Sequence, residues 1–143
     1  MNADDGTPSI PDSVRETLCR DPDVEFVLGF GSRIEGDHRS SSDLDVAVKF
    51  SDDLSSEERF RKRCRLSGRL QRSDLPFVDL SDIDELSLEF AHAAVGGEFV
   101  CGDEDLFREH KRTIESEFED RREEIERRQR EVISRIAEEG LHG

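Results

Sequence analysis

The chain is 143 residues long, a length that suits one domain and leaves no room for a separate nucleic-acid-binding domain beside a catalytic one. Its 36 acidic and 21 basic residues give a formal net charge of −15. Such a charge opposes non-specific binding to nucleic acids and to anionic membranes, because both kinds of binding depend on Lys and Arg neutralising phosphates.

The first part of the chain predicts a helix followed by two strands. Residues 1–11 are rich in Asp, Gly and Pro and are expected to be flexible. A helix is expected to begin at Asp12-Ser13. Two apolar segments, residues 24–30 and 43–50, predict strands that are joined by a Gly31-Ser32 turn and a polar connection. Alternation along the second strand assigns its side chains to two faces, Val46, Val48 and Phe50 on one and Asp43, Asp45, Ala47 and Lys49 on the other.

The middle of the chain predicts helices alternating with strands. Residues 55–72 form a charged helical pattern, residues 75–80 a third strand, residues 81–94 a second helical pattern and residues 98–101 an edge strand. The apolar faces expected for the two helices are Phe60, Cys64 and Leu70 in the first and Leu86, Phe90 and Ala94 in the second. This order of elements predicts an α+β (α/β) fold, with a small mixed sheet flanked by helices.

The last part of the chain, residues 104–139, predicts one long and strongly charged helix. Its apolar stripe is narrow and consists of Phe107, Ile114, Phe118, Ile125, Val132 and Ile136. Arg121, Arg128 and Arg135 occupy positions that a long symmetric coiled coil would need to be apolar. Two interpretations follow, a helix that packs on its own domain and a helix whose distal part docks a partner. The expected organisation is therefore a flexible 1–11, a catalytic core over 12–103 and a helical segment over 104–143.

The chemistry-bearing segment joins the two predicted N-terminal strands and reads GFGSRIEGDHRSSSDLDVAVK over residues 29–49. Asp43 and Asp45 project from the same side of a strand, and two neighbouring carboxylates repel each other unless a cation lies between them. Mg²⁺ is the simplest such cation, because it combines carboxylate ligands with water and substrate phosphates. The Gly31 amide and the Ser32 hydroxyl can hold a phosphate oxygen.

A third acid, Asp79, lies among the apolar residues of the third predicted strand, where a carboxylate needs a partner or a metal. Two metal ions sharing three carboxylates suit phosphoryl or nucleotidyl transfer. The Asp-x-Asp pair by itself is also compatible with a solvated strand start. Asp74, Asp82 and Asp84 lie near Asp79, and we expect Asp82 and Asp84 to cap or start the following helix.

The motif of Gly-Ser, ten residues and Asp-x-Asp resembles the signature of the DNA polymerase β-type nucleotidyltransferase superfamily. The small size resembles the minimal nucleotidyltransferases, the MntA-like antitoxins encoded beside HEPN ribonuclease toxins. The resemblance implies catalytic roles for Asp43, Asp45 and Asp79 as ligands of two Mg²⁺ ions, with ATP as substrate. It implies that Gly31 and Ser32, with Arg33 and Ser42, bind the nucleotide. Many relatives have Arg where this chain has Glu35, so the chain lacks one positive charge near the triphosphate. Arg33 or Arg39 would supply that charge instead.

The resemblance implies that the protein transfers AMP from ATP to the hydroxyl group of a tyrosine on a HEPN toxin. This transfer neutralises the toxin. Because the chain contains no Tyr, a tyrosine acceptor must lie on a partner, with which the chain forms a hetero-oligomer. A non-enzymatic antitoxin that acts by binding is the first alternative. The second alternative is an antibiotic nucleotidyltransferase, although such enzymes resemble this domain with a further substrate-binding domain.

The counts of Lys, Arg, Cys and His indicate the kind of cell and compartment in which we expect the protein. The chain has 18 Arg and only 3 Lys, and an acidic, Lys-poor chain is typical of salt-adapted proteins, so we expect a halophilic source. The three Cys form no C-x-x-C pair and are expected to be free thiols in a reducing cytoplasm. The four His lack the spacing of metal ligands. No signal peptide or membrane-spanning run is visible, so we expect a cytoplasmic protein.

Overall fold

A computed structural model describes residues 10–31, 43–71 and 77–140 of the chain. The predictions of a flexible N-terminus and of a polar connection over 33–42 therefore fall mainly outside the described residues. Within these ranges, none of the helices is long and apolar enough to cross a membrane.

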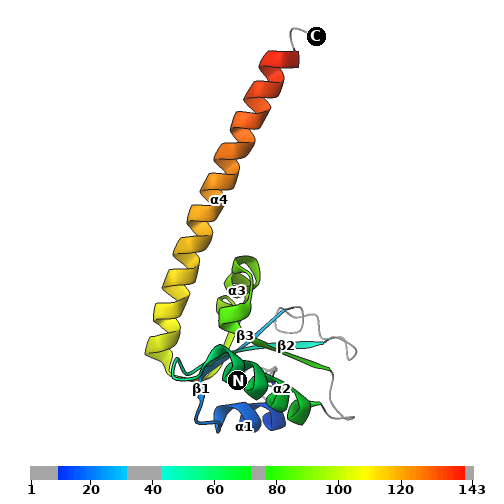
Figure 1. Ribbon diagram of the computed structural model, residues 1–143, viewed down its shortest axis with the longest axis vertical. Coiled ribbons are helices and arrows are strands. Elements are labelled where there is room, and N and C mark those ends of the chain that lie inside the picture. Colours follow the sequence, from blue (N-terminus) through cyan, green and yellow to red (C-terminus); the bar gives the residue numbers. More distant parts are fainter. Residues whose placement is uncertain (1–9, 32–42, 72–76, 141–143) are drawn as a thin grey trace, which may run out of the picture.

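The described chain contains one mixed sheet of four strands (Figure 1). The strands are β1 (Val24–Phe30), β2 (Leu44–Phe50), β3 (Val78–Asp82) and β4 (Glu98–Gly102). They lie in the order β3-β2-β1-β4, with β1 antiparallel to both of its neighbours and β2 parallel to β3. The predicted fold class and the edge position of β4 are confirmed.

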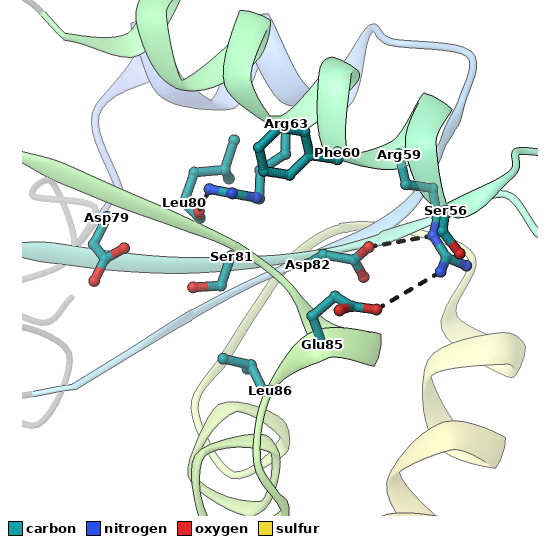
Figure 2. A pocket seen from close by; sticks show the side chains of 10 residues that line it. All are labelled: Ser56, Arg59, Phe60, Arg63, Asp79, Leu80, Ser81, Asp82, Glu85 and Leu86. Carbon is teal, nitrogen blue, oxygen red and sulfur yellow. Dashed lines mark hydrogen bonds and ion pairs between the residues drawn. The ribbon is translucent and has the colours of Figure 1, made fainter.

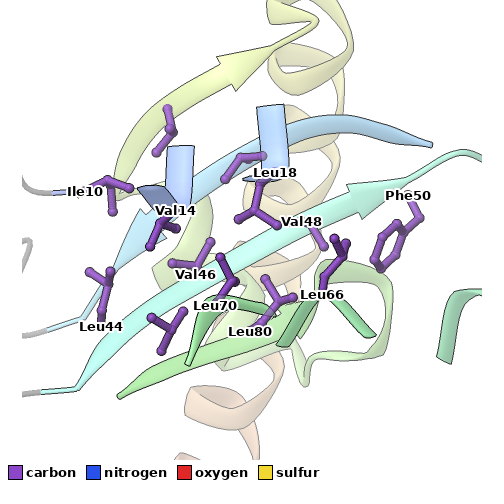
Figure 3. Packing of buried hydrophobic residues seen from close by; sticks show 13 residues of the cluster. Ile10, Val14, Leu18, Leu44, Val46, Val48, Phe50, Leu66, Leu70 and Leu80 are labelled. Carbon is purple, nitrogen blue, oxygen red and sulfur yellow. The ribbon is translucent and has the colours of Figure 1, made fainter. Parts of the chain in front are cut away.

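Helices cover both faces of this sheet. They are α1 (Asp12–Cys19), α2 (Ser56–Leu70), the 3-10 turn η1 (Ile83–Glu85), α3 (Leu88–Val95) and α4 (Glu104–Gly140). α1 and α2 pack on one face, where their apolar side chains join Val46, Val48 and Phe50 of β2 in one core (Figure 3). α3 and the first turns of α4 pack on the other face, which carries Ala47. The alternation predicted along β2 is therefore confirmed.

The predicted apolar faces of two helices are partly wrong. α2 buries Leu66 and Leu70, whereas Phe60 is 58% exposed and Cys64 is exposed. The reason is that the buried face of α2 carries Leu66 and Leu70, and at 100° per residue Phe60 and Cys64 lie about 100° or more around the helix from that face. α3 begins at Leu88 after its cap residue Ser87, so its buried face is shifted by about one position and Phe90 is 62% exposed.

The prediction of three free thiols is wrong for two of them. Cys19, at the end of α1, is bonded to Cys101 of β4, and the two Cα atoms are 6.1 Å apart. Both residues are partly buried against the core that α1 and α2 cover. Their separation of 82 residues hides the pair in the sequence, because only the packing of α1 beside β4 brings them together. Cys64 remains a free thiol.

β3 is the outer strand on its side of the sheet, and side chains of neighbouring elements hold it in place. Gln71, just beyond α2, donates a hydrogen bond to the Val78 carbonyl (2.8 Å) and accepts one from the Val78 amide (3.2 Å). The buried ammonium of Lys49 on β2 binds Asp84 of η1 (3.0 Å) and Asp52 (2.8 Å). Burial alone would lower the pKa of Lys49, but the hydrogen bonds to Asp52 and Asp84 outweigh burial and raise it.

α4 consists of 37 residues, about 55 Å of helix, and only its first half packs on the domain (Figure 1). Ile114 is buried, and Phe118 stacks on His92 of α3 with ring centroids 3.8 Å apart. Beyond this stack the helix projects away, and the large apolar side chains Ile125, Val132, Ile133 and Ile136 are 45–66% exposed. The interpretation of a helix packed on its own domain thus holds for the first half, whereas docking of a partner by the distal half remains a prediction.

The disulfide should make a large contribution to stability. Replacing both Cys19 and Cys101 by Ser should lower the free energy of unfolding by about 2–4 kcal/mol, because the bond closes a long loop in the unfolded chain. Urea denaturation under non-reducing conditions measures this loss. Cys64→Ser is the matched control and should change stability by less than about 0.5 kcal/mol, since its side chain is exposed. A double variant as stable as the control would contradict the assignment.

Candidate functional site

The register of the sheet places two of the predicted acids side by side. Asp45 of β2 lies opposite Asp79 of β3 in the parallel ladder, and neighbouring strands are about 4.8 Å apart. Residues opposite each other in such a ladder project to the same face. Asp43, two residues before Asp45, shares this side and immediately precedes the first residue of β2. The structure therefore sets Asp45 beside Asp79, and the negative charge of Asp43 acts on Asp45 from the start of β2.

Gly31, at the end of β1, lies against Asp45 on the side away from β3. In the antiparallel pairing of β1 with β2, Phe30 lies opposite Asp45, and Gly31 follows with a φ of +90°. A Cβ atom at this position would lie 2.2 Å from Asp45 Oδ2. Only glycine combines this left-handed backbone conformation with such a close approach of backbone to carboxylate.

The electrostatics of Asp45 favour a bound cation. Its pKa is raised above the usual carboxyl range, first by burial and then by the negative charges of Asp79 and Asp43. Because an ionised carboxylate in this position is unfavourable, a divalent cation would relieve both the burial and the repulsion.

The donor set of the site fits Mg²⁺, which prefers carboxylate oxygens. Across residues 10–31, 43–71 and 77–140, no three Asp, Glu, His or Cys side chains converge closely enough to hold a metal ion in their present rotamers. Asp45 and Asp79 are paired in the parallel ladder, so these two carboxylates are the ones that would hold a cation together.

Several predicted nucleotide-binding residues cannot be placed. Ser32, Arg33 and Ser42 lie outside the described residues, as do Glu35 and Arg39. Gly31 is the predicted nucleotide-binding residue that the structure places, and it lies against Asp45.

A cavity of about 400 Å³ opens at the outer edge of β3, between α2 and η1 (Figure 2). Asp79 lies at one end, and Arg59 and Glu85 lie at the other. Phe60 and Arg63 of α2 line the middle of the cavity, and the Arg63 guanidinium is 5.3 Å from the centroid of the Phe60 ring. Sequence reasoning missed this cavity, because the helical pattern assigned Phe60 to the core and gave no reason to place α2 beside Asp79.

Asp82, also beside the cavity, has a structural role. It accepts a hydrogen bond from the Asp84 amide (2.9 Å), which confirms the prediction that it caps the next element. Burial raises its pKa, while the Asp84 amide and the Arg59 guanidinium act in the opposite direction. Arg59 Nε is 3.4 Å from Asp82 Oδ2, and since this buried nitrogen makes no hydrogen bond to a described residue, the contact is electrostatic.

Comparison with known proteins places the chain in context. Residues 12–106 match the family model described as polymerase beta, nucleotidyltransferase. No curated protein matches the chain in sequence.

Solved structures share the fold at low sequence identity. A toxin-antitoxin complex with AMP-PNP is 21% identical, with a TM-score of 0.64 over 85% of this chain and 97% of the other. A variant of an MntA toxin-antitoxin complex is 24% identical, with a TM-score of 0.63 over 87% and 98% of the two chains. A complex of tri-AMPylated Shewanella oneidensis HEPN toxin with MNT antitoxin is 21% identical, with a TM-score of 0.55 over 83% and 88%.

The close approach of Gly31 to Asp45 predicts a large effect of a single methyl group. Gly31→Ala should lower the free energy of unfolding by about 2 kcal/mol, because it combines a disfavoured φ with a clash against the carboxylate. Gly68→Ala is the matched control. Gly68 is helical and has open space around its Cβ position, so the same change should stabilise the protein slightly. Chemical denaturation of the two variants measures the difference, and equal effects would contradict the arrangement.

The raised pKa of Asp45 predicts that its charge destabilises the folded protein at neutral pH. Asp45→Asn should therefore raise Tm by a few degrees in the absence of divalent cations. Since the folded pKa is raised, the penalty disappears as the pH falls through it, and the difference between variant and wild type should shrink in acid. Thermal denaturation from pH 7 downwards measures this, with the exposed Asp53→Asn as control. A lower Tm for Asp45→Asn at pH 7 would contradict the account.

Proposed function

The chain belongs to the polymerase beta nucleotidyltransferase family, and from this premise we propose that it transfers AMP from ATP to a hydroxyl group of a partner protein. The observation that carries the proposal is the register of β2 and β3, which sets Asp45 beside Asp79, with Gly31 packed against Asp45. Nucleotidyl transfer needs carboxylates that can hold cations next to a phosphate-binding turn, and the Asp45–Asp79 pair beside the Gly31 backbone supports this proposal.

Each residue of the proposed site has a role. Asp43, Asp45 and Asp79 would hold two Mg²⁺ ions, which when bound supply neutralisation of the triphosphate and of the leaving pyrophosphate. The Gly31 amide, with Ser32, would bind the β- and γ-phosphates, and Arg33 and Ser42 would add contacts to the nucleotide.

The reaction is a substitution at the α-phosphorus of ATP. The acceptor oxygen forms a bond to this phosphorus, the bond from the phosphorus to the oxygen that bridges to the β-phosphate breaks, and pyrophosphate leaves. The acceptor hydroxyl gives its proton to the exposed carboxylate of Asp79, which releases it to solvent. The products are an AMP phosphodiester of the acceptor and pyrophosphate.

The partner we propose is a HEPN-type toxin, which the transfer neutralises. Three observations support a protein acceptor. The distal half of α4 exposes an apolar stripe that the described part of the chain does not cover, the chain contains no Tyr of its own, and its charge of −15 favours a basic protein over a nucleic acid. Likeness of fold to antitoxins in toxin complexes agrees with this choice.

A second candidate, inhibition of the toxin by binding alone, is favoured by the same exposed stripe of α4, because docking there needs no chemistry. Catalysis and binding are separable, since the stripe and the carboxylates lie on different elements.

The catalytic proposal predicts the effect of removing two carboxylates. In Asp43→Ala/Asp45→Ala, transfer of label from [α-³²P]ATP to the co-expressed toxin should fall at least about 100-fold, because the charge stabilisation of the transition state is lost. Binding of the toxin, measured by co-purification, should be unchanged. Asp53→Ala, an exposed acid on the loop after β2, is the control and should transfer normally.

Two outcomes would contradict this proposal. Transfer that is equal in the double variant and the wild type would remove the carboxylates from the mechanism. Full protection of cells by the double variant at equal dose would instead favour inhibition by binding alone.

A further inference from the structure

The distal half of α4 differs in charge from the rest of the chain. Residues 121–143, which include it, contain six Arg and six Glu and are formally neutral. Residues 1–120 contain 30 acidic and 15 basic residues and so carry the whole charge of −15. Three large apolar side chains of the distal half, Ile125, Val132 and Ile136, form one exposed row. A second protein with acidic groups can therefore approach this half of the helix without the repulsion that the rest of the chain exerts.

The apolar row has a basic flank. Arg121, Arg128 and Arg135 are all exposed and share one side of α4, about 60° around the helix from the centre of the row. Seven-residue spacing sets them about 10 Å apart along the helix axis. Arg128 pairs with the exposed Glu124 of its own helix (2.6 Å), whereas Arg121 and Arg135 form no ion pair with a described side chain. These arginines are therefore available to carboxylates of another molecule.

We infer that this surface docks one amphipathic helix of the partner protein, with carboxylates of that helix beside Arg121, Arg128 and Arg135. This rests on the proposed function, which makes the acceptor protein the partner. The row from Ile125 to Ile136 is straight and about 16 Å long, so it fits a second helix that lies along α4. Asp or Glu at seven-residue spacing on that helix would match the arginines through charge-assisted hydrogen bonds. The net charge of the chain attracts a basic protein at long range, whereas the arginines select the helix at contact.

A second copy of this chain does not fit the row. Two copies paired antiparallel about a two-fold axis would set the arginine flank of one helix against the arginine flank of the other, because such an axis brings identical sides together. Two copies paired in parallel would set the first half of one α4 where α3 of the other copy already lies, since Ile114 and Phe118 of the same row contact the domain. The occupant is therefore a helix of another protein.

The continuity of the row indicates where the docked partner lies. Toward the domain, the row continues with Ile114, which packs in the core on the sheet face that α3 covers, and with Phe118, which stacks on α3. Asp45 shares this face, because it alternates with the buried Ala47 along β2. Beyond α3, the distal half of α4 continues away from the sheet (Figure 1). A helix docked there holds the partner on the side of the sheet that carries the carboxylates, so α4 positions the acceptor.

Binding of the toxin in the absence of ATP tests the arginine flank. Arg121→Glu/Arg128→Glu should raise the Kd for the toxin at least about 10-fold, because attraction at the contact becomes repulsion. Arg127→Glu/Arg130→Glu is the matched control. It makes the same change in net charge on the same helix, but its two positions lie about 140–200° around the helix from Ile125. The control should bind within about 3-fold of the wild type, and equal Kd values for the two pairs would overturn the inference.

A second variant tests the apolar row. Ile125→Ser/Val132→Ser changes two exposed side chains and leaves the domain core intact. It should raise both the Kd and the KM for the toxin at least about 10-fold, with kcat and the Kd for AMP-PNP within about 2-fold of the wild type. Phe60→Ser is the control, because it removes an exposed ring of α2 on the opposite face of the sheet. A Kd for the toxin equal to that of this control, or a fall in kcat with unchanged KM, would contradict the docking surface.

Two further measurements identify the occupant. Hydrogen exchange of the toxin in the complex should show protection of one helix that carries Asp or Glu beside an apolar row. Protection of a basic helix, or of loops alone, would overturn the inference. Sedimentation of the chain alone should show a monomer. A dimer that Ile125→Ser/Val132→Ser dissociates would also overturn it, because a second copy would then cover the row.

Because binding needs no ATP, these measurements separate the docking surface from the proposed function. If the wild type transfers no AMP but binds the toxin through the arginine flank, the proposed function fails and the docking surface stands. If transfer occurs and both variant pairs bind like their controls, the docking surface fails and the proposed function stands. A toxin that does not bind the wild-type chain overturns both.

Discussion

The parallel pairing of β2 with β3 is the constraint on which the candidate site depends. It sets Asp45 directly beside Asp79, although ionised carboxylates on neighbouring strands repel each other. Because β3 is an outer strand, its position must be stabilised from elsewhere. The hydrogen bond from the Leu44 amide to the Phe77 carbonyl (2.8 Å), the carboxamide of Gln71 and the core beneath Leu80 supply this support. The repulsion at the site is thus offset by contacts that lie outside it.

One face of the sheet carries the main apolar core, and the other carries the candidate site. The face under α1 and α2 is a continuous apolar core, and the Cys19–Cys101 bond joins the end of α1 to β4. The opposite face carries Asp45 and Asp79 at one end of the strands and the Lys49–Asp84 pair farther along β2. Buried or half-buried charges on this face are tolerated because the other face already holds the strands in register. A cation bound at the carboxylates would therefore stabilise a protein that already folds without it.

The strands and the carboxylates could be predicted from the sequence, because period-two alternation assigns faces without knowledge of the fold. Asp43 and Asp45 flank an apolar residue at a strand start, and Asp79 interrupts apolar neighbours, so their shared face follows from local pattern. The expected burial of Phe60 and Phe90 is wrong, because a row of apolar residues along a helix does not by itself identify the side of the helix that faces the sheet. The disulfide and the cavity depend on contacts between elements far apart in the chain, which no local pattern encodes.

The central claim is that Asp43, Asp45 and Asp79 together hold two cations that serve a nucleotide bound at Gly31. Electron paramagnetic resonance of Mn²⁺, titrated into the protein with a non-hydrolysable ATP analogue blocked between the α- and β-phosphates, tests it most directly. The account predicts two ions bound per chain in the presence of the analogue, with spin coupling between them, and loss of the coupled pair in Asp79→Asn. Two uncoupled ions, or a coupled pair that persists in Asp79→Asn, would contradict it.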